Sequence, residues 1–412
     1  MVYTNVSNVV QRMDVTMDVN KKNIAVIITS LSGGGAEKVA SLLINKYSKD
    51  HNVHVIFTDS MNIDYSISEG VIFRKISYNF KHSYFFNILF IPVYGIKLFK
   101  YLKKNNIDIV LSFLSRPNFI ACFTRIVGFK GNIVISERSN IVKWLLPGTF
   151  KGLIGKFLYE WLYPKADCLI PNSKLTGYNL QNDWNLNSNY QVIYNPIELE
   201  KIKTSHLLQT KLPGNNNAFK CIMVGRFDYP KDQHTLIRTA LLLKNENVDL
   251  IFIGKGPNWT LAKDMVKSYK LEHKIFFIDF DPNPYKYIHQ ADLFVFSSLF
   301  EGFPNAIIEA MACGIPVIST DCQSGPREII APNTDFTKQI SEGIELGEYG
   351  IIVPVQNERI FSEAILMIKN DKKLQERLKI ASLLRAQNFE STKIIEEFSK
   401  ILFNKSKIAH HN

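Results

Sequence analysis

Two carboxylates, Glu301 and Glu309, lie eight positions apart in the segment FEGFPNAIIEAMACGIPVIST (300–320). Glu301 falls in a turn rich in Gly and Pro, whereas Glu309 falls within a predicted helix for which Pro304 is suited as the first residue. At about 3.6 residues per turn, Glu309 is near enough to the helix start to face an anion bound there. We expect this arrangement to bind a phosphorylated ligand whose hydroxyl groups the carboxylates hold.

Two cations follow the end of a predicted strand in the segment GRFDYPKD (225–232). Arg226 and Lys231 stand five positions apart, and charge-assisted contacts from such groups contribute about 1.5–3 kcal/mol each. We expect them to neutralise a diphosphate, together with amide N–H groups of the helix that starts after Phe303. A diphosphate is a good leaving group, so catalysis depends more on stabilising its departing charge than on a strong nucleophile.

A glycine-rich loop joins the first predicted strand to its helix in the segment SLSGGGAEK (30–38). Gly33, Gly34 and Gly35 allow backbone N–H groups to approach an anion at the start of that helix. The loop has neither G-x-G-x-x-G spacing nor a G-K-[ST] ending, which disfavours dinucleotide and P-loop binding. Two interpretations stay open: a contact with an anionic ligand, and a tight turn without a ligand.

Two arginines follow other predicted strands of the first half: Arg138 in ISERSN (135–140) and Arg116 in LSFLSRPN (111–118). Both are candidates to contact a phosphate of a ligand. The D-x-D sequence at 279–281 is similar to a known metal-binding pattern, but no further carboxylate cluster accompanies it. We therefore expect neither a metal nor another cofactor.

The motif around the two glutamates resembles the donor-binding motif of retaining glycosyltransferases of family 4, which have the GT-B fold. The resemblance extends through ADLFVFSSLFEGFPN upstream and SGPREII downstream, and it covers about residues 23–400. GGGAEK, ISERSN and SGPREI further resemble bacterial members that extend lipid-linked oligosaccharides. Among these, the N-acetylgalactosaminyl transferases with undecaprenyl diphosphate acceptors are the most similar in pattern.

The resemblance implies roles for the individual residues. Glu301 would hold hydroxyls of the donor sugar and Glu309 those of the ribose, while Arg226 and Lys231 would bind the departing diphosphate. Glu301, Arg226 and Lys231 would thus be catalytic. Besides Glu309, the donor-binding positions that it implies are Gly225, Phe303, Pro304, Asn305 and Ala306.

Two positions depart from the family pattern. Asp232 stands where glycine usually follows the lysine, which is expected to alter the entry into the next helix. Arg138 stands where many relatives have a histidine near the donor sugar, so the role of that histidine is not carried over. In the family the glycine-rich loop lies near the diphosphate and the acceptor.

The elements that position these residues are predicted as two series of strands and helices. Apolar runs of strand length occur in the first half at 23–30, 52–59, 107–113, 132–137, 168–173 and 190–196. The glycine loop and an amphipathic helix over about residues 36–49 separate the first two runs, which indicates a βαβ unit in a parallel sheet. A second series follows at 220–226, 248–254, 274–279, 293–298, 316–320 and 350–355.

This repeated order predicts two doubly wound, Rossmann-like α/β domains that face a cleft. We assign an acceptor- and membrane-binding domain to 23–200 and a nucleotide-sugar donor-binding domain to 201–390, with the polar stretch 203–219 as a linker or surface loop. Residues 1–22 are mainly polar and are predicted to be a disordered extension. The GT-B resemblance implies that the last helix, within 391–412, crosses back onto the first domain.

Length and composition agree with a two-domain enzyme of the cytosol. A chain of 412 residues exceeds what one core usually serves, and 46% hydrophobic with 21% charged residues is ordinary for a soluble protein. The five cysteines show no C-x-x-C pairing, which argues against a zinc site and a disulfide framework. The polar start has no apolar core of signal-peptide length.

The net charge of +11 is concentrated in the first half, where residues 74–165 contain 15 Lys and Arg but three acids. The cations alternate with Trp, Tyr, Phe and Leu in the segments 84–104 and 144–165, a composition typical of a surface that lies in a membrane interface. The longest uncharged run, roughly 82–96, is too short to span a bilayer. A nucleic-acid surface and a solvated basic face over a core helix are the alternatives; we expect an anionic membrane and no nucleic acid.

Taken with the resemblance, these features predict a peripheral enzyme on the cytoplasmic face of the plasma membrane. It would transfer a hexose or N-acetylhexosamine from a UDP-sugar to a polyprenyl-diphosphate-linked saccharide. Two alternatives remain: a UDP-sugar 2-epimerase of the same fold, which needs no lipid acceptor, and a non-catalytic assembly protein that binds nucleotide-sugars.

Overall fold

The computed structural model describes residues 21–76, 88–138, 149–184, 186, 190–208 and 210–403. The predicted N-terminal extension lies outside the described residues except for its last two positions. The final part of 391–412 and parts of the two basic, aromatic segments also lie outside them.

The first domain is a sheet of parallel strands in the order β3-β2-β1-β4-β5-β6. Apart from the edge strand β3, its strands are mainly apolar runs because helices cover both faces of the sheet. The strands are β1 (Asn23–Ile28), β2 (Asn52–Phe57), β3 (Ile72–Lys75), β4 (Ile109–Phe113), β5 (Asn132–Glu137) and β6 (Cys168–Pro171). The helices are α1 (Gly35–Tyr47), α3 (Ile91–Lys104), α4 (Ser115–Ile126), α6 (Phe150–Leu162) and α7 (Lys174–Asn182).

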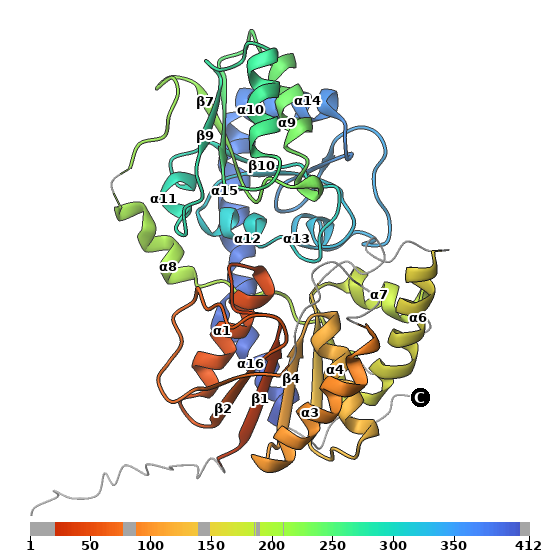
Figure 1. The fold of residues 1–412 in the computed structure, drawn as a ribbon. Coiled ribbons are helices and arrows are strands. Elements are labelled where there is room, and N and C mark those ends of the chain that lie inside the picture. The colour runs from red at the N-terminus through yellow and green to blue at the C-terminus, as the bar shows by residue number, and fades with distance from the viewer. Residues whose placement is uncertain are drawn as a thin grey trace, which may run out of the picture.

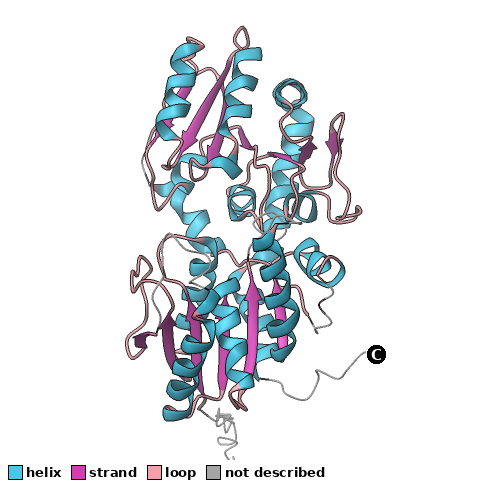
Figure 2. Cartoon of the chain, turned by 45° about the vertical axis from the view of Figure 1, so that its right-hand side comes forward, coloured by secondary structure: helices cyan, strands magenta, loops and turns pink. Residues whose placement is uncertain are grey.

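The second domain contains a seven-stranded sheet in the order β12-β13-β11-β10-β7-β8-β9, in which β12 pairs antiparallel to β13. The strands are β7 (Phe219–Val224), β8 (Val248–Ile253), β9 (Ile275–Ile278), β10 (Leu293–Phe296), β11 (Val317–Thr320), β12 (Glu345–Leu346) and β13 (Ile351–Val353). The helices are α9 (Gln233–Leu242), α10 (Trp259–Ser268), α11 (Tyr285–Ile288), α12 (Asn305–Ala312), α13 (Pro326–Ile330), α14 (Glu358–Asn370) and α15 (Lys372–Ala386). The prediction of two doubly wound α/β domains is confirmed, as the alternating helices and strands of Figure 2 show.

One strand predicted from the sequence differs from the structure, and two strands of the structure were not predicted. The run 190–196 forms no regular strand: Tyr190 bridges Leu169, the amides of Gln191 and Ile193 still donate to the carbonyls of Leu169 and Pro171 in β6, and the chain then leaves the first sheet. Ile193 packs in the first domain, whereas Tyr194 lies against Phe303 of the second, so its apolar residues serve the junction between domains. The edge strands β3 and β12 were not predicted, because they are short and largely solvated and lack the apolar signal of a buried strand.

The chain crosses between the domains at two places. Helix α8 (Leu199–Thr204) contributes Leu199 and Ile202 to the core of the second domain. Helix α16 (Ser391–Phe403) returns to the first domain, where it lies beside α1 in Figure 1. Its Phe398 is buried in the first-domain core, and Ser399 Oγ lies 3.2 Å from Tyr47 Oη, which confirms the predicted return of the last helix.

Candidate active site between the two domains

Lys231 and Glu301 meet at the edge of the second sheet that holds the carboxyl ends of the strands. The loop after β7 carries Lys231 and the loop after β10 carries Glu301, and these two strands are neighbours. Lys231 Nζ lies 2.6 Å from Glu301 Oε1 and 5.1 Å from the centre of the Phe296 ring. Two side chains 70 positions apart in the sequence therefore form one cation–carboxylate unit.

The same loop presents Arg226 to solvent. Its side chain is 70% exposed, with Nε 3.7 Å from Asp228 Oδ2, so its guanidinium is accessible to a diphosphate. The backbone around it is fixed: Gln233 donates to the Arg226 carbonyl, and Ser297 Oγ lies 2.9 Å from the carbonyl oxygens of both Lys231 and Asp232. The loop can therefore present its cations from a rigid support.

Helix α12 begins one residue later than predicted. Pro304 precedes the helix, with φ −81° and ψ 92°, and Asn305 is the first helical residue. Pro304 occupies the N-cap position, and its side chain accepts no hydrogen bond from the first amide groups of the helix. The positive end of the helix dipole is therefore available to a ligand. Phe303 is buried and stacks on Tyr194 at 5.1 Å, so its ring belongs to the core, and Ala306 is partly buried against the same cluster.

Glu309 contacts a residue that the sequence did not single out. Lys38 of α1, in the first domain, places Nζ 2.6 Å from Glu309 Oε1 and 3.2 Å from the hydroxyl of Tyr285. The Tyr285 hydroxyl also lies 3.1 Å from Glu309 Oε1. Lys38 is the last residue of the quoted segment SLSGGGAEK, so its position in a predicted site loop was the signal available.

The glycine-rich loop faces the start of α12 across the domain junction. Gly33 has φ +63°, a left-handed backbone that glycine adopts without strain. A Cβ at Gly35 would lie 3.1 Å from Asn305 Nδ2, so a larger side chain would press against the first residue of α12. Asn195 Nδ2 donates to Asn305 Oδ1 at 2.6 Å, which adds a second polar bridge between the domains.

The two predicted first-domain arginines lie in structural networks. Arg138 is buried, donates to Ser136 Oγ at 2.8 Å and to Asn195 Oδ1, and lies 5.7 Å from the Phe113 ring centre and 5.4 Å from that of Phe398. Burial lowers the pKa of Arg138 to about 9, although neighbouring Glu137 opposes this shift. Through Asn195 it supports Asn305, so it reaches the start of α12 through another residue.

Arg116 forms an ion pair with Asp59 and donates to the Thr58 carbonyl at 3.3 Å, linking α4 to the loop after β2. Burial lowers the pKa of Arg116, and the Asp59 charge opposes that shift. Phosphate contacts for Arg116 and Arg138 remain predictions.

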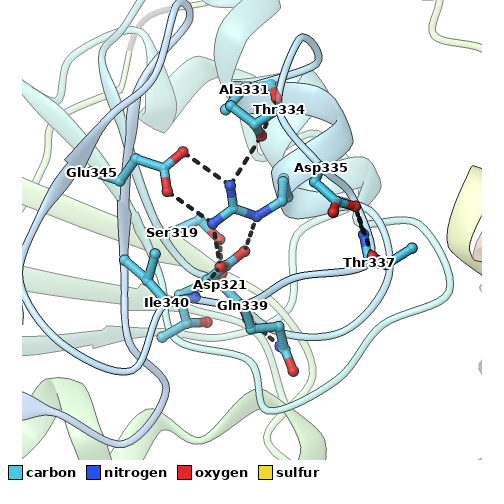
Figure 3. Close-up of polar contacts among 11 residues, drawn as sticks. Ser319, Asp321, Ala331, Thr334, Asp335, Thr337, Gln339, Ile340 and Glu345 are labelled. Atoms are coloured by element: carbon cyan, nitrogen blue, oxygen red, sulfur yellow. Dashed lines mark hydrogen bonds and ion pairs between the residues drawn. The ribbon is translucent and has the colours of Figure 1, made fainter.

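The SGPREI segment contains an arginine that cross-links two parts of the second domain. Arg327 forms two bidentate pairs, with Asp321 at 3.1 and 2.5 Å and with Glu345 at 2.9 Å through both oxygens (Figure 3). Its Nη1 also lies 3.0 Å from Thr334 Oγ1. This network ties the strand end after β11 to β12, and thereby fixes the turn that enters α13.

The next residue, Glu328, joins the second domain to the first. Its carboxylate accepts hydrogen bonds from the backbone amides of Lys174 at 2.7 Å and Leu175 at 3.0 Å, the first two residues of α7. It also accepts from the Tyr194 hydroxyl at 3.1 Å, and Ser324 Oγ lies 2.6 Å from Ser173 Oγ. A second-domain carboxylate therefore caps a first-domain helix.

The D-x-D sequence forms no metal cluster in the described part of the chain. Asp281 is 2.7 Å from Lys286 Nζ and accepts from the Asn283 amide at 2.8 Å. Nowhere among the described residues do three or more His, Cys, Asp or Glu side chains gather closely enough to hold a metal ion.

Comparison with known proteins identifies the family of the chain. The Glycosyltransferase Family 4 model matches residues 33–201, and the Glycosyl transferases group 1 model matches residues 207–383. A Campylobacter jejuni protein is 32% identical over 92% of this chain and 99% of its own length. Its name is N-acetylgalactosamine-N,N'-diacetylbacillosaminyl-diphospho-undecaprenol 4-alpha-N-acetylgalactosaminyltransferase. The chain belongs to glycosyltransferase family 4.

Other family 4 relatives and GT-B structures extend this result. A second Campylobacter jejuni protein, named as a GalNAc-alpha-(1->4)-GalNAc-alpha-(1->3)-diNAcBac-PP-undecaprenol alpha-1,4-N-acetyl-D-galactosaminyltransferase, is 25% identical over 92% of this chain and 98% of its own. Sucrose-phosphate synthase from Thermosynechococcus elongatus superposes with a TM-score of 0.73 at 18% identity, covering 92% of this chain and 98% of its own. HepE from Anabaena, solved with UDP and glucose, superposes with a TM-score of 0.68 at 15% identity, covering 92% and 98%. At such identities the structures establish the GT-B fold alone.

Proposed function

We propose that this family 4 glycosyltransferase transfers a hexose or N-acetylhexosamine from a UDP-sugar to a polyprenyl-diphosphate-linked saccharide, with retention at the anomeric carbon and without a metal. The observation that carries the proposal is the meeting of Lys231 and Glu301 beside exposed Arg226 and the uncapped start of α12. The undecaprenol-linked substrates in the names of the two Campylobacter relatives support the acceptor class. UDP in the HepE structure supports the donor class.

The chemistry follows from the charges at the cleft. As the bond between the anomeric carbon and the diphosphate breaks, negative charge grows on the leaving oxygen. Arg226, Lys231 and the amide groups of α12 would stabilise that charge, and the amide groups, fixed by the helix, would do so without reorganisation. Glu301 would hold sugar hydroxyls while paired to Lys231, and Glu309 would hold the ribose.

An exposed apolar and basic face of the first domain supports docking on an anionic membrane. Leu153 and Phe157, one turn apart on α6, are 62% and 61% exposed, and Trp161 continues the row. Phe157 stacks on Trp161 at 5.9 Å, and Trp161 meets Phe123 of α4 edge-on at 6.3 Å.

Helix α3, which packs against α4, adds Val93 and Ile96, also exposed, with Lys97 and Lys100 beside them. Aromatic and aliphatic side chains bordered by lysines suit the interface of an anionic leaflet, where each cation contributes about 1 kcal/mol. None of the helices in the described ranges is both long and apolar enough to cross a bilayer. We propose that the enzyme binds the cytoplasmic leaflet through this face.

A panel of radiolabelled UDP-sugars tests the proposal, with purified enzyme, vesicles and a polyprenyl-diphosphate-linked saccharide acceptor. We expect label to enter the lipid fraction from a single preferred donor and only with acceptor present. Lys231→Met should lower kcat/KM by about a hundredfold or more, because it removes a cation that acts on the leaving diphosphate. Lys267→Met, at an exposed position on α10 away from the loops that carry the site, is the control and should stay within about twofold.

The alternatives give other results in the same assay. Conversion of the UDP-sugar without acceptor would indicate an epimerase. UDP binding without any turnover would indicate an assembly protein, and either outcome would reject the proposed transfer.

A further inference from the structure

The contact between Lys38 and Glu309 joins the two domains across the site. Lys38 lies on α1 of the first domain, whereas Glu309 and Tyr285 lie on α12 and α11 of the second. The pair is separated by 271 positions in the sequence and by 2.6 Å in space. By contrast, Lys231 and Glu301 both belong to the second domain, so their contact does not depend on how the domains sit.

The two donors to Glu309 share one oxygen. Lys38 Nζ and the Tyr285 hydroxyl both bind Oε1, at 2.6 and 3.1 Å. Within the described part of the chain, Oε2 accepts no hydrogen bond from another side chain or amide. The lysine and tyrosine thus fix the carboxylate in one orientation and leave its second oxygen for a hydroxyl of a ligand.

The environment makes this orientation depend on closure of the domains. The Lys38 and Glu309 side chains are 19% and 13% exposed, so the pair is largely shielded from water. Burial by itself lowers the pKa of Lys38, but pairing with Glu309 and Tyr285 outweighs burial and raises that pKa overall. If the domains separate, water replaces Lys38 and the Glu309 carboxylate regains rotational freedom. A ligand that binds the open enzyme must then immobilise this carboxylate, which weakens its binding.

We propose that Lys38 is a positioning residue by which the first domain sets the affinity of the second domain for the nucleotide. In the closed enzyme, Lys38 holds the ribose-binding carboxylate ready; in an open enzyme, it releases that carboxylate. Nucleotide binding and domain closure are therefore coupled, and by reciprocity the nucleotide favours closure. The inference rests on the proposed function, because it assigns the ribose to Glu309.

Binding of UDP to the full-length protein, measured by calorimetry, tests this role. We expect Lys38→Met to weaken UDP about ten- to hundredfold, the range for loss of a charge-assisted hydrogen bond. Lys38→Arg should recover most of the affinity, since a cation is kept. Lys46→Met, at an exposed position near the end of the same helix, is the matched control and should bind UDP as the wild type does.

A double-mutant cycle separates this role from a general effect on folding. The loss caused by Lys38→Met should disappear in a Glu309→Gln background and persist in full in a Glu301→Gln background. Equal UDP affinity for Lys38→Met and Lys46→Met, or the same loss in the Glu309→Gln background as in the wild type, would overturn the inference. If Lys38→Met does not fold, Lys38→Gln keeps a polar side chain at the same position without the charge, and unchanged UDP affinity there would overturn the inference as well. Failure of the wild-type protein to bind UDP would instead reject the proposed function.

Discussion

At the scale of single residues, the site is built from two lysine–glutamate pairs of different kinds. Lys231 holds Glu301 within one domain, and Lys38 holds Glu309 across two domains. The sequence identified both glutamates and Lys231 from type and spacing. It did not reveal the pairing, because the partners are 70 and 271 positions apart and nothing local links them.

Arg327 also acts through charge pairing, because its guanidinium binds two carboxylates. Arg327→Met leaves Asp321 and Glu345 without their counter-charge in a largely buried place, where breaking such a network costs about 3–5 kcal/mol. We expect calorimetry to show a clearly lower midpoint for the transition of the second domain. Arg359→Met, which removes an exposed guanidinium paired with Glu363, should change stability by less than about 0.5 kcal/mol. Equal effects of the two changes would contradict the structural role of Arg327.

At the scale of elements, the start of α7 depends on a residue from the other domain. Glu328→Gln replaces one acceptor oxygen by an amide donor that opposes the backbone N–H groups of Lys174 and Leu175. A lost cap costs about 0.5–2 kcal/mol, so we expect faster hydrogen exchange at these two amides and a lower thermal midpoint. Exposed Glu272→Gln is the control. Unchanged exchange at α7 would show that the cap does not stabilise the helix.

The turn into α9 gives a second prediction for an element. Asp232 has φ 44°, a left-handed conformation that costs a non-glycine residue about 1–2 kcal/mol, and its Oδ2 accepts from Thr235 Oγ1 at 2.7 Å. Asp232→Ala keeps the strain and loses the hydrogen bond, whereas Asp232→Gly loses the hydrogen bond but also the strain. We therefore expect the glycine variant to be more stable than the alanine variant by about 1 kcal/mol in chemical denaturation. Equal stabilities would show that the backbone at this position is not strained.

At the scale of the whole molecule, the first domain presents the face proposed to meet the membrane. Replacing Leu153 and Phe157 by Glu removes two exposed apolar groups, each contributing about 1.5–3 kcal/mol when buried. We expect at least a tenfold loss of binding to phosphatidylglycerol vesicles in sedimentation, and weaker wild-type binding as salt increases. The double change Leu261→Glu with Ile380→Glu, at exposed positions of the second domain, is the control. Equal binding by both variants would rule out this face.

The pattern of the whole fold was predictable because its strands are buried on both faces and form continuous apolar runs. The glycine-rich and acidic loops at their ends were predictable for the same reason: parallel strands place their carboxyl ends along one edge. Prediction failed at 190–196, where apolar residues serve a junction between domains, and at β3 and β12, where solvated edges need few apolar residues. Arg138 was predicted to contact a phosphate from its place after β5; its guanidinium packs between Phe113 and Phe398 and reaches the start of α12 through Asn195, and the phosphate contact remains a prediction.

The sequence by itself determined the chemical groups that are available, which are two carboxylates, two cations and a glycine-rich loop, and the two α/β domains that carry them. These follow from residue type and short-range periodicity, which a chain displays without folding. The tertiary structure alone decided which groups meet across the two domains: Glu328 caps α7, and Lys38 pairs with Glu309. Such contacts join residues of different domains, so they depend on how the two sheets are placed by the crossings at α8 and α16, which local sequence does not encode.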